Sequence, residues 1–262
     1  MLLKYLRLYR AFFKASFVAD LEYRANFITR IFTDIFWYLA QIITFETLYR
    51  HMDKIGDWSL PQTRVFLGVL FVVDAIYMIV FHDNLDQISE RVRKGELDLL
   101  LAKPVNSQFM LSTQRVSTAL FGNLMIGMSW LIYSLSQIPT LPLLNYFWFL
   151  ALIPAGLVAI YSVRFGFCTM SLLFTRAENI QYMWFQIYKL GMRPDSIYFP
   201  WVRFLLVTVL PVGFVASIPS RALMEPANHA LFLWVILWSC ILLYLSHRWW
   251  NWCLKHYSSA SS

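Results

Sequence analysis

The sequence predicts an all-α protein that crosses a membrane several times, and three observations support this fold class. Hydrophobic residues make up 59% of the 262 positions and charged residues only 14%, whereas soluble domains carry about 25% charged residues. Several apolar runs reach the roughly 20 residues with which a helix crosses a bilayer. These runs are continuous and lack the alternation of period two that is typical of membrane β-barrels. We therefore expect a polytopic bundle of six transmembrane helices.

The N-terminal residues 2–25 form a basic amphipathic pattern. Large apolar residues recur along one stripe, and basic residues lie between them, namely Lys4, Arg7, Arg10 and Lys14. Such a helix is suited to the interface of an anionic cytoplasmic leaflet, so residues 1–26 are expected to form an interfacial helix. It could serve as a membrane anchor or as a binding site for a partner protein. The same charges prevent this segment from forming the apolar core of a cleavable signal peptide.

The expected membrane domain covers residues 27–250, and a cytoplasmic tail follows at residues 251–262, with Ser258–Ser262 expected to be disordered. The six spans are expected near residues 27–49, 65–82, 110–136, 146–174, 201–223 and 230–250. Lys and Arg are more frequent in the segments placed inside, including Arg91–Lys94, Lys189 and Arg193, than in those placed outside, which hold Arg50, Lys54, Arg64 and Arg221. By the positive-inside rule, both termini are therefore expected in the cytoplasm.

Residues 84–105 form a charged segment between the second and third expected spans, so this segment must lie in water against the inner membrane face. Leu85, Ile88 and Val92 recur at helical spacing, and Gly95 is expected to end the helix. The polar residues of the segment are Glu90, Arg91, Arg93, Lys94, Glu96 and Asp98. A rigid charged element at the inner mouth of a helix bundle is a surface on which a soluble partner could push.

The expected fifth span is irregular, because it contains Pro211, Gly213 and Pro219. Proline in a helix interior removes a backbone hydrogen bond and kinks the chain. We expect a span that ends near Pro211, followed by a re-entrant piece through Ala222, because broken backbone at membrane depth must be buried in protein or line a wet cavity. A kinked but otherwise ordinary span is the alternative.

Asp34, Asp74 and Arg164 are charged residues expected within the membrane, together with Glu46 near the outer end of the first span. At about 1.5 Å of rise per residue, the first three lie roughly 10, 12 and 15 Å from the inner ends of their spans. They fall in one band, so a pair between Arg164 and either Asp34 or Asp74 is geometrically reasonable. Intramembrane charges are costly unless they are paired or hydrated. These residues could form a structural ion pair, or they could line a substrate or proton path.

The sequence contains no ATP-binding P-loop and no HExxH, CxxC or GxSxG motif. We therefore expect no catalytic residue, no metal and no cofactor in this chain. Cys168, Cys240 and Cys253 show no ligand spacing and are expected to be packing residues. The neighbouring His82 and Asp83 are most simply a solvated polar pair. The net charge of +7 follows from membrane topology, so a nucleic-acid partner is not expected.

Four stretches of the chain resemble the six-span permeases of bacterial type-2 ATP-binding-cassette (ABC) exporters. They are Asp20–Phe27, Ile55–Leu60, Val92–Val105, and Tyr198–Phe204 with Leu210–Phe214. The third is the most specific, because it reads as a charge-rich helix, Gly95, an acidic residue, a Leu run and Pro104. The likeness extends over roughly residues 1–250.

This resemblance implies a permease that dimerises in the bacterial inner membrane and binds two cytoplasmic ATPase subunits, which would hold ATP and Mg. The N-terminal helix at residues 2–25 and the loop at residues 84–104 would contact the ATPases. Re-entrant helices would lie between spans 5 and 6. The second permease could be another copy or a related chain, membrane lipids would surround both, and the resemblance leaves the exported substrate open.

An ion-coupled secondary transporter that uses Asp34, Asp74 and Arg164 is the main alternative, although the paired inverted repeats of many such transporters are not visible. An intramembrane enzyme that acts on lipids is a third possibility, but the sequence shows no recognisable nucleophile or metal constellation. Co-purification with an ATPase would separate the first two hypotheses.

Overall fold

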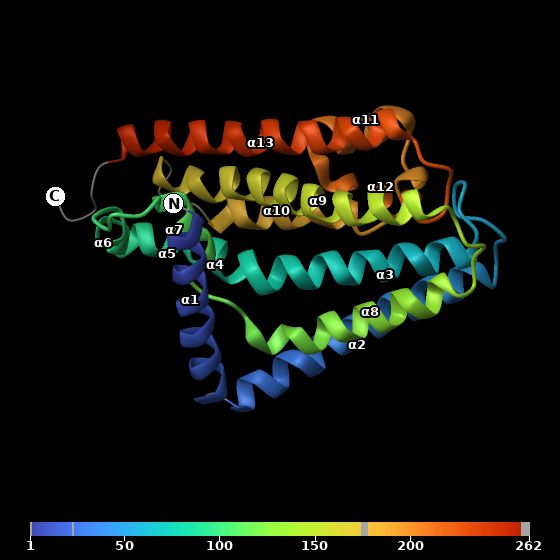
Figure 1. The fold of residues 1–262 in the computed structure, drawn as a ribbon, viewed down its shortest axis with the longest axis horizontal. Coiled ribbons are helices and arrows are strands. Elements are labelled where there is room, and N and C mark those ends of the chain that lie inside the picture. Colours follow the sequence, from blue (N-terminus) through green and yellow to red (C-terminus); the bar gives the residue numbers. More distant parts are fainter. Residues whose placement is uncertain (1, 23, 174–177, 258–262) are drawn as a thin grey trace.

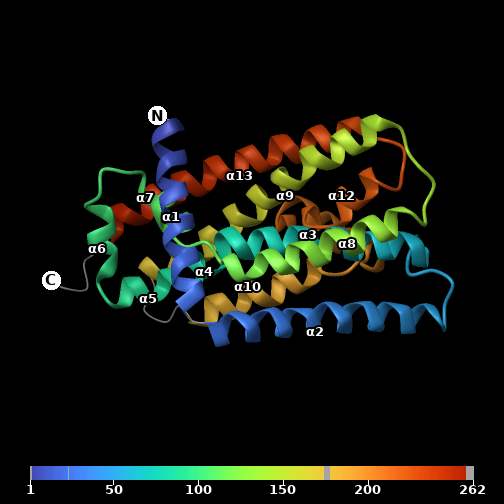
Figure 2. The ribbon, with the colours of Figure 1, turned by 60° about the horizontal axis from the view of Figure 1, so that its bottom comes forward.

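The computed structural model describes residues 2–22, 24–173 and 178–257, and every element in that part of the chain is a helix. The long helices run side by side along one axis, while the first helix crosses them near one end (Figure 1 and Figure 2). The elements are α1 (Leu2–Glu22), α2 (Arg24–Tyr49), α3 (Leu60–Tyr77), η1 (Met78–His82), α4 (Asp83–Asp86), α5 (Ile88–Arg93), α6 (Glu96–Leu101), α7 (Ser107–Thr113), η2 (Thr118–Leu120), α8 (Phe121–Leu135), α9 (Leu143–Thr169), η3 (Met170–Leu172), α10 (Glu178–Gly191), η4 (Asp195–Ile197), α11 (Pro200–Thr208), η5 (Pro211–Phe214), α12 (Ser217–Ala222) and α13 (His229–His256).

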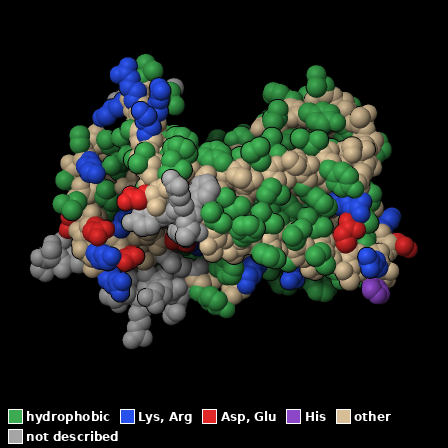
Figure 3. Space-filling model, turned by 90° about the horizontal axis from the view of Figure 1, so that it is seen from below, with side chains coloured by type: hydrophobic (Ala, Val, Ile, Leu, Met, Phe, Trp, Pro, Cys, Tyr) green, Lys and Arg blue, Asp and Glu red, His purple; other side chains and the backbone are tan. Residues whose placement is uncertain are grey.

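The two ends of the bundle are named here by the elements that they hold. The α5 end carries α1, α5 and α6, and the α12 end carries α12 and the loop at residues 50–59 (Figure 1). Hydrophobic side chains cover the middle of the face in Figure 3, and Lys, Arg, Asp and Glu gather toward its two ends. Ser258–Ser262, for which a disordered tail is expected, lie outside the described residues, and α13 continues through His256, so the first part of the expected tail is helical.

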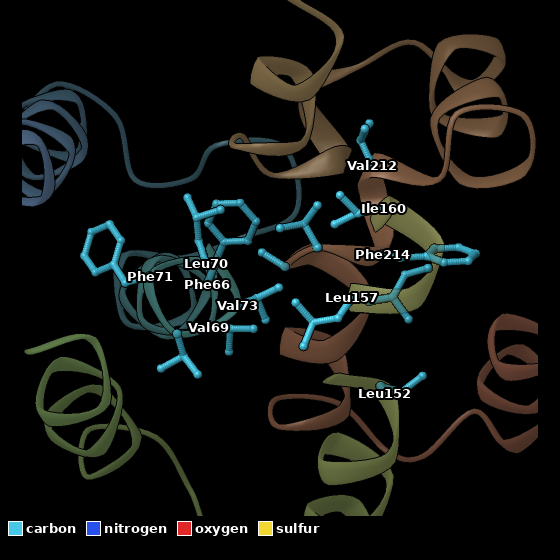
Figure 4. Close-up of a cluster of buried hydrophobic side chains, with 14 of the residues drawn as sticks. Phe66, Val69, Leu70, Phe71, Val73, Leu152, Leu157, Ile160, Val212 and Phe214 are labelled. Carbon is cyan, nitrogen blue, oxygen red and sulfur yellow. The ribbon is translucent and has the colours of Figure 1, made fainter. Parts of the chain in front are cut away.

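Helix α3 is the centre of the fold, because its apolar run is enclosed on all sides. Every residue from Val65 to Val73 is buried, and a helix that is hydrophobic all round requires such a position. Its side chains pack with those of α9 and η5 in the cluster of Figure 4. Helix α8 approaches closely where Gly68 faces Leu131 and Gly127 faces Phe71, which is how small residues bring membrane helices together.

The described residues include four helices that are long and apolar enough to cross a membrane. They are Leu60–Arg93, Thr118–Leu135, Leu143–Leu172 and His229–His256. The expected first and fifth spans, at residues 27–49 and 201–223, are not among them. Helix α2 covers the first of these but carries Arg30, Asp34 and Glu46, which make it more polar than α3, α8, α9 and α13.

The expected third span at residues 110–136 is wrong in its first part, because α7 and α8 are separated by an irregular stretch. Side chains from distant elements bind the backbone there. Asn84 accepts a hydrogen bond from Arg115 N and donates one to Arg115 O, and Ser16 Oγ accepts one from Val116 N. These partners replace the hydrogen bonds of a continuous helix.

Residues 201–223, expected to hold the fifth span, do not form one long helix but fold as α11, η5 and α12, after α10. Asp195 follows α10 and binds Arg221, and the Arg221 guanidinium lies 5.3 Å from the ring centroid of Trp58 in the loop at the α12 end. Arg193, expected inside, therefore lies near a loop expected outside. Helix α10 has 14 residues, fewer than the roughly 20 of an apolar span, so hydropathy does not reveal it.

Residues 200–222 instead form a hairpin whose two ends lie together. Helix α11 runs into the bundle, η5 makes the turn, and α12 returns. Arg203 near the start and Arg221 near the end both bind Asp195, and Asn145 Nδ2 in α9 donates to Ala222 O at the end of α12. Both ends of the hairpin are thus at the α12 end of the bundle.

Candidate functional site

The charged segment at the α5 end folds as two short helices on an apolar base. Leu85, Ile88 and Leu97 are fully buried, in a cluster that includes Phe165 and Trp250. Where one amphipathic helix was expected, the structure has α4 and α5 with Gln87 between them, and their apolar side chains pack on α9 and α13 while the polar face is left outside. Burying three such side chains contributes roughly 1.5–3 kcal/mol each, which fixes the segment to the bundle.

Gly95 separates α5 from α6 in the left-handed conformation, with φ of 71°, which confirms that it ends the helix. Lys94 Nζ lies 2.8 Å from Glu90 Oε1, and this carboxylate raises the pKa of Lys94. Arg93 and Glu96 are exposed, Asp98 is partly buried, and Arg91 donates back to Gln87 Oε1. Leu99, at 71% exposure, stands among these charges. We call the exposed face of Glu90–Leu99 the coupling surface.

Helix α1 is fastened to this same end. Lys4 Nζ donates to Pro104 O at 2.9 Å, the ring of Tyr5 meets that of Phe109 edge-on, and Asp20 Oδ2 accepts from Thr118 N and Oγ1. Arg7, Arg10 and Lys14 are exposed, as are several large apolar residues of α1, which are Leu3, Leu6, Phe13, Phe17, Val18 and Leu21. An exposed apolar stripe beside basic residues is the pattern of an interfacial helix.

A cavity of about 380 Å³ opens within the half of the bundle nearer the α5 end. Helices α2, α3, α9 and α10 supply its walls, and η1 and α4 close one side. It is lined by Asp34, Trp37, Tyr38, Asp74, Tyr77, Met78, His82, Asp86, Arg164, Trp184, Phe185, Tyr188 and Met192. We call this space the central cavity. The structure thus brings together the three charged residues that were predicted within the membrane.

The predicted ion pair of Arg164 with Asp34 or Asp74 is wrong, because Arg164 binds Asp86 instead. Asp34 Oδ2 accepts from Asn123 Nδ2 at 2.5 Å, and Asp74 Oδ1 accepts from Tyr188 Oη at 2.7 Å. The depth estimate was sufficient to place the charges in one layer. It gave no information on the rotation of each helix, which decides the side on which a charge lies.

The central cavity is joined to the coupling surface by continuous helix. Met78 and His82 of the π-helical turn η1 and Asp86 of α4 line the cavity, and α5 begins at Ile88. His82 Nε2 also lies 3.4 Å from Asp86 Oδ2. A displacement of α5 would therefore be transmitted to the cavity wall through only one or two turns.

A second polar cluster closes the α12 end. Asp195, only 3% exposed, accepts from Arg203 Nε at 2.8 Å and from Arg221 Nη2 at 3.0 Å. Arg221 also donates to Glu225 Oε1 at 2.7 Å, and its guanidinium lies over the ring of Trp58. This cluster joins both ends of the hairpin to η4.

The predicted helix breakers of the hairpin have different roles. Pro211 begins η5, and Pro219 lies in the first turn of α12. Backbone N–H groups in a first turn have no partner within the helix, so proline costs no helical hydrogen bond there. Gly213 approaches Val207 closely, but tighter contacts involve two glycines outside the hairpin. A Cβ atom on Gly156 or Gly191 would lie 2.5 Å from Phe214 O or 2.6 Å from Val212 O, respectively.

Sequence reasoning missed several residues of these sites. Asp86 lay within the recognised charged segment, and its spacing of four from His82 would have placed the two on one helical face. Tyr188 and Asp195 gave no signal, because α10 was taken for a cytoplasmic connection. Only contacts between distant segments identify them.

A protein-family model described as ABC-2 family transporter protein matches residues 35–261. No curated protein and no solved structure was found to be similar to the chain. The match covers most of the chain, including α3 to α13 with the coupling surface, and it takes in the cavity-lining elements except for the first part of α2, which holds Asp34. The chain belongs to the ABC-2 family of transporter proteins.

Proposed function

We propose that this chain is the permease subunit of an ATP-driven exporter, and that a separate cytoplasmic cassette ATPase dimer docks on the coupling surface. One observation carries the proposal. A helical path of 34 residues, Leu60–Arg93, runs from the core through the cavity wall to this exposed, charged element. The sequence lacks a P-loop, so the partner subunits would bind ATP and Mg.

In this proposal the membrane is crossed six times, by α2, α3, α8, α9, α10 and α13, with both termini in the cytoplasm of a bacterial cell. The hairpin at residues 200–222 would be re-entrant from the outer face. Helix α1 would lie among lipid headgroups, with its basic residues in the interface. A second permease, either another copy or a related chain, would complete the translocation path at a dimer interface.

The proposal is tested by co-expressing the tagged chain with a cassette ATPase from the same genome and purifying it in mild detergent. We expect the ATPase to co-purify with the native chain, and ATP hydrolysis by the complex to respond to the permease. The double replacement Glu90→Lys with Lys94→Glu reverses the surface charges yet keeps the ion pair. Gly95→Pro cannot adopt φ of 71°, because proline fixes φ near −65°.

Both variants are expected to insert normally and to uncouple hydrolysis from transport. Gly166→Ala is the matched control, because a Cβ atom at Gly166 meets nothing within 4 Å and the change alters neither the charges of the coupling surface nor the break at Gly95. Normal coupling in both surface variants, or a native chain that never carries an ATPase, would refute the docking role.

A further inference from the structure

The central cavity combines acidic and aromatic side chains in a way that suits one class of ligand. We propose that it binds an amphiphilic organic cation, a molecule with a positively charged centre on an apolar, partly aromatic body. As cargo of an exporter, this ligand rests on the proposed function, but its binding to the chain can be measured without the ATPase.

The charges on the cavity wall do not cancel. Arg164 is engaged by Asp86, and Arg30, one turn before Asp34, makes a bidentate pair with Asp83 at 2.9 and 3.0 Å. The hydrogen-bond partners of Asp34 and Asp74 among the described residues, Asn123 and Tyr188, are neutral, and Arg30 and His82 act on these acids only without direct contact. Carboxylates at membrane depth are costly without a counter-charge, and a bound cation would supply one.

The rest of the wall suits an organic cation better than a bare metal ion. Trp37 and Tyr38 come from α2, and Trp184 and Tyr188 from α10. Aromatic faces attract cations. The ring of Trp184 makes one such cation–π contact within the protein, because the Arg164 guanidinium lies 5.7 Å from its centroid. A hard metal ion would instead require six or more oxygen ligands.

Two buried polar atoms of the wall have no hydrogen-bond partner among the described residues. They are Tyr77 Oη and Arg164 Nε, whose residues are only 3% and 4% exposed. Buried polar groups are normally satisfied, and both residues line the cavity. A polar substituent on the ligand could bind these atoms, and the volume of about 380 Å³ lies in the range of small-molecule sites.

The test uses the full-length chain alone in lipid nanodiscs, with two probes of the same shape and opposite charge. Binding of labelled tetraphenylphosphonium and of tetraphenylborate is measured, with the signal of empty nanodiscs subtracted. We expect saturable binding of the cation only. Each of Asp34→Asn and Asp74→Asn should raise its Kd by about tenfold, the loss of one charge interaction worth about 1.4 kcal/mol.

Glu46→Gln is the matched control, because Glu46 is an acid of the same helix α2 but binds Arg64 and does not line the cavity. Tyr38→Leu removes an aromatic side chain from the wall and keeps every charge, and it should also weaken binding. If an Asp variant does not fold, this variant still tests the site. Equal binding of both probes, or a Kd unchanged in all three cavity variants, would overturn the proposal. If the chain binds the cation but no ATPase co-purifies, the cavity site is upheld and only the docking role is rejected. If an ATPase co-purifies but the cation does not bind, only the cavity site is rejected.

Discussion

The two buried polar clusters of this protein differ in how completely their charges are neutralised. At the α12 end, Asp195 is shared by Arg203 and Arg221, and Glu225 binds Arg221 as well. In the central cavity, Asp34 and Asp74 accept hydrogen bonds only from neutral groups among the described residues, Asn123 and Tyr188, and neither forms an ion pair there. The first cluster holds a hairpin in place, and the second leaves charge and space for something else. Buried charge is therefore held in ion pairs at the α12 end, whereas in the central cavity the proposed cation would supply the missing counter-charge.

Packing follows the same division. Around η5, the backbone comes so close to Gly156 and Gly191 that neither position has room for a Cβ atom. In the other half, the same helix α9 carries Gly166 with nothing within 4 Å and Arg164 beside the cavity. At these glycines the packing is tight in the half nearer the α12 end and loose in the half nearer the α5 end, although a cavity of about 530 Å³ also opens beside Asp195, Arg203 and Arg221.

The largest effect is expected from Asp195→Asn, which would leave Arg221 without its buried counter-charge. Removing one partner of a buried ion pair costs about 3–5 kcal/mol, so the midpoint of thermal unfolding in detergent should fall markedly. Glu225→Gln, which removes a partner of the same arginine at a site with 43% side-chain exposure, should cost about 1 kcal/mol or less. Similar midpoints for the two variants would show that the cluster is not a structural clamp.

Gly156→Val should come next, because the added side chain must displace the backbone at Phe214. Overpacking of a close contact costs about 1–3 kcal/mol, which the unfolding midpoint would report. Gly166→Ala in the same helix should instead raise stability by up to about 1 kcal/mol, since alanine favours the helical state. The contrast between the two halves fails if both glycine replacements shift the midpoint in the same direction.

Asp74→Asn tests the half nearer the α5 end directly, and its effect on stability should be opposite to that of Asp195→Asn. Asp74 is 7% exposed, and within the described part of the chain only Tyr188 donates a hydrogen bond to it, so the amide removes a buried charge that has no ion-pair partner there. We expect the free energy of unfolding to be unchanged or higher by about 1 kcal/mol, so the unfolding midpoint should stay the same or rise slightly. Ligand binding should become weaker, as is common when a binding site is stabilised. A loss of stability as large as that of Asp195→Asn would place Asp74 among the structural residues.

The smallest effect on stability is expected from Glu90→Gln on the coupling surface. The Glu90–Lys94 pair is exposed, and such pairs contribute little to folding, so the unfolding midpoint should not change measurably. The pKa of Lys94 should fall when its carboxylate partner is removed, because that partner raises it. NMR titration of the Lys94 side chain would check this, and an unchanged pKa would mean that the pair does not persist in solution.

Local pattern determined much of this protein. The length of the apolar runs predicts a membrane bundle, the spacing of Leu85 and Ile88 gives the buried face of the charged segment, and Gly95 sets its break, because each of these depends on neighbours in the chain. The family resemblance, carried by short stretches of residues, is confirmed by the match to residues 35–261.

The tertiary structure alone decided which charges meet. Depth along a helix is proportional to residue number, so Asp34, Asp74 and Arg164 could be placed in one layer. The partner of Arg164 depends on the rotation and neighbours of each helix, and it proved to be Asp86. Helix α10 has no long apolar run that would mark it in the sequence, yet it supplies Tyr188 to the cavity and leads to Asp195. Its position is fixed by contacts between residues far apart in the chain, which no local pattern records.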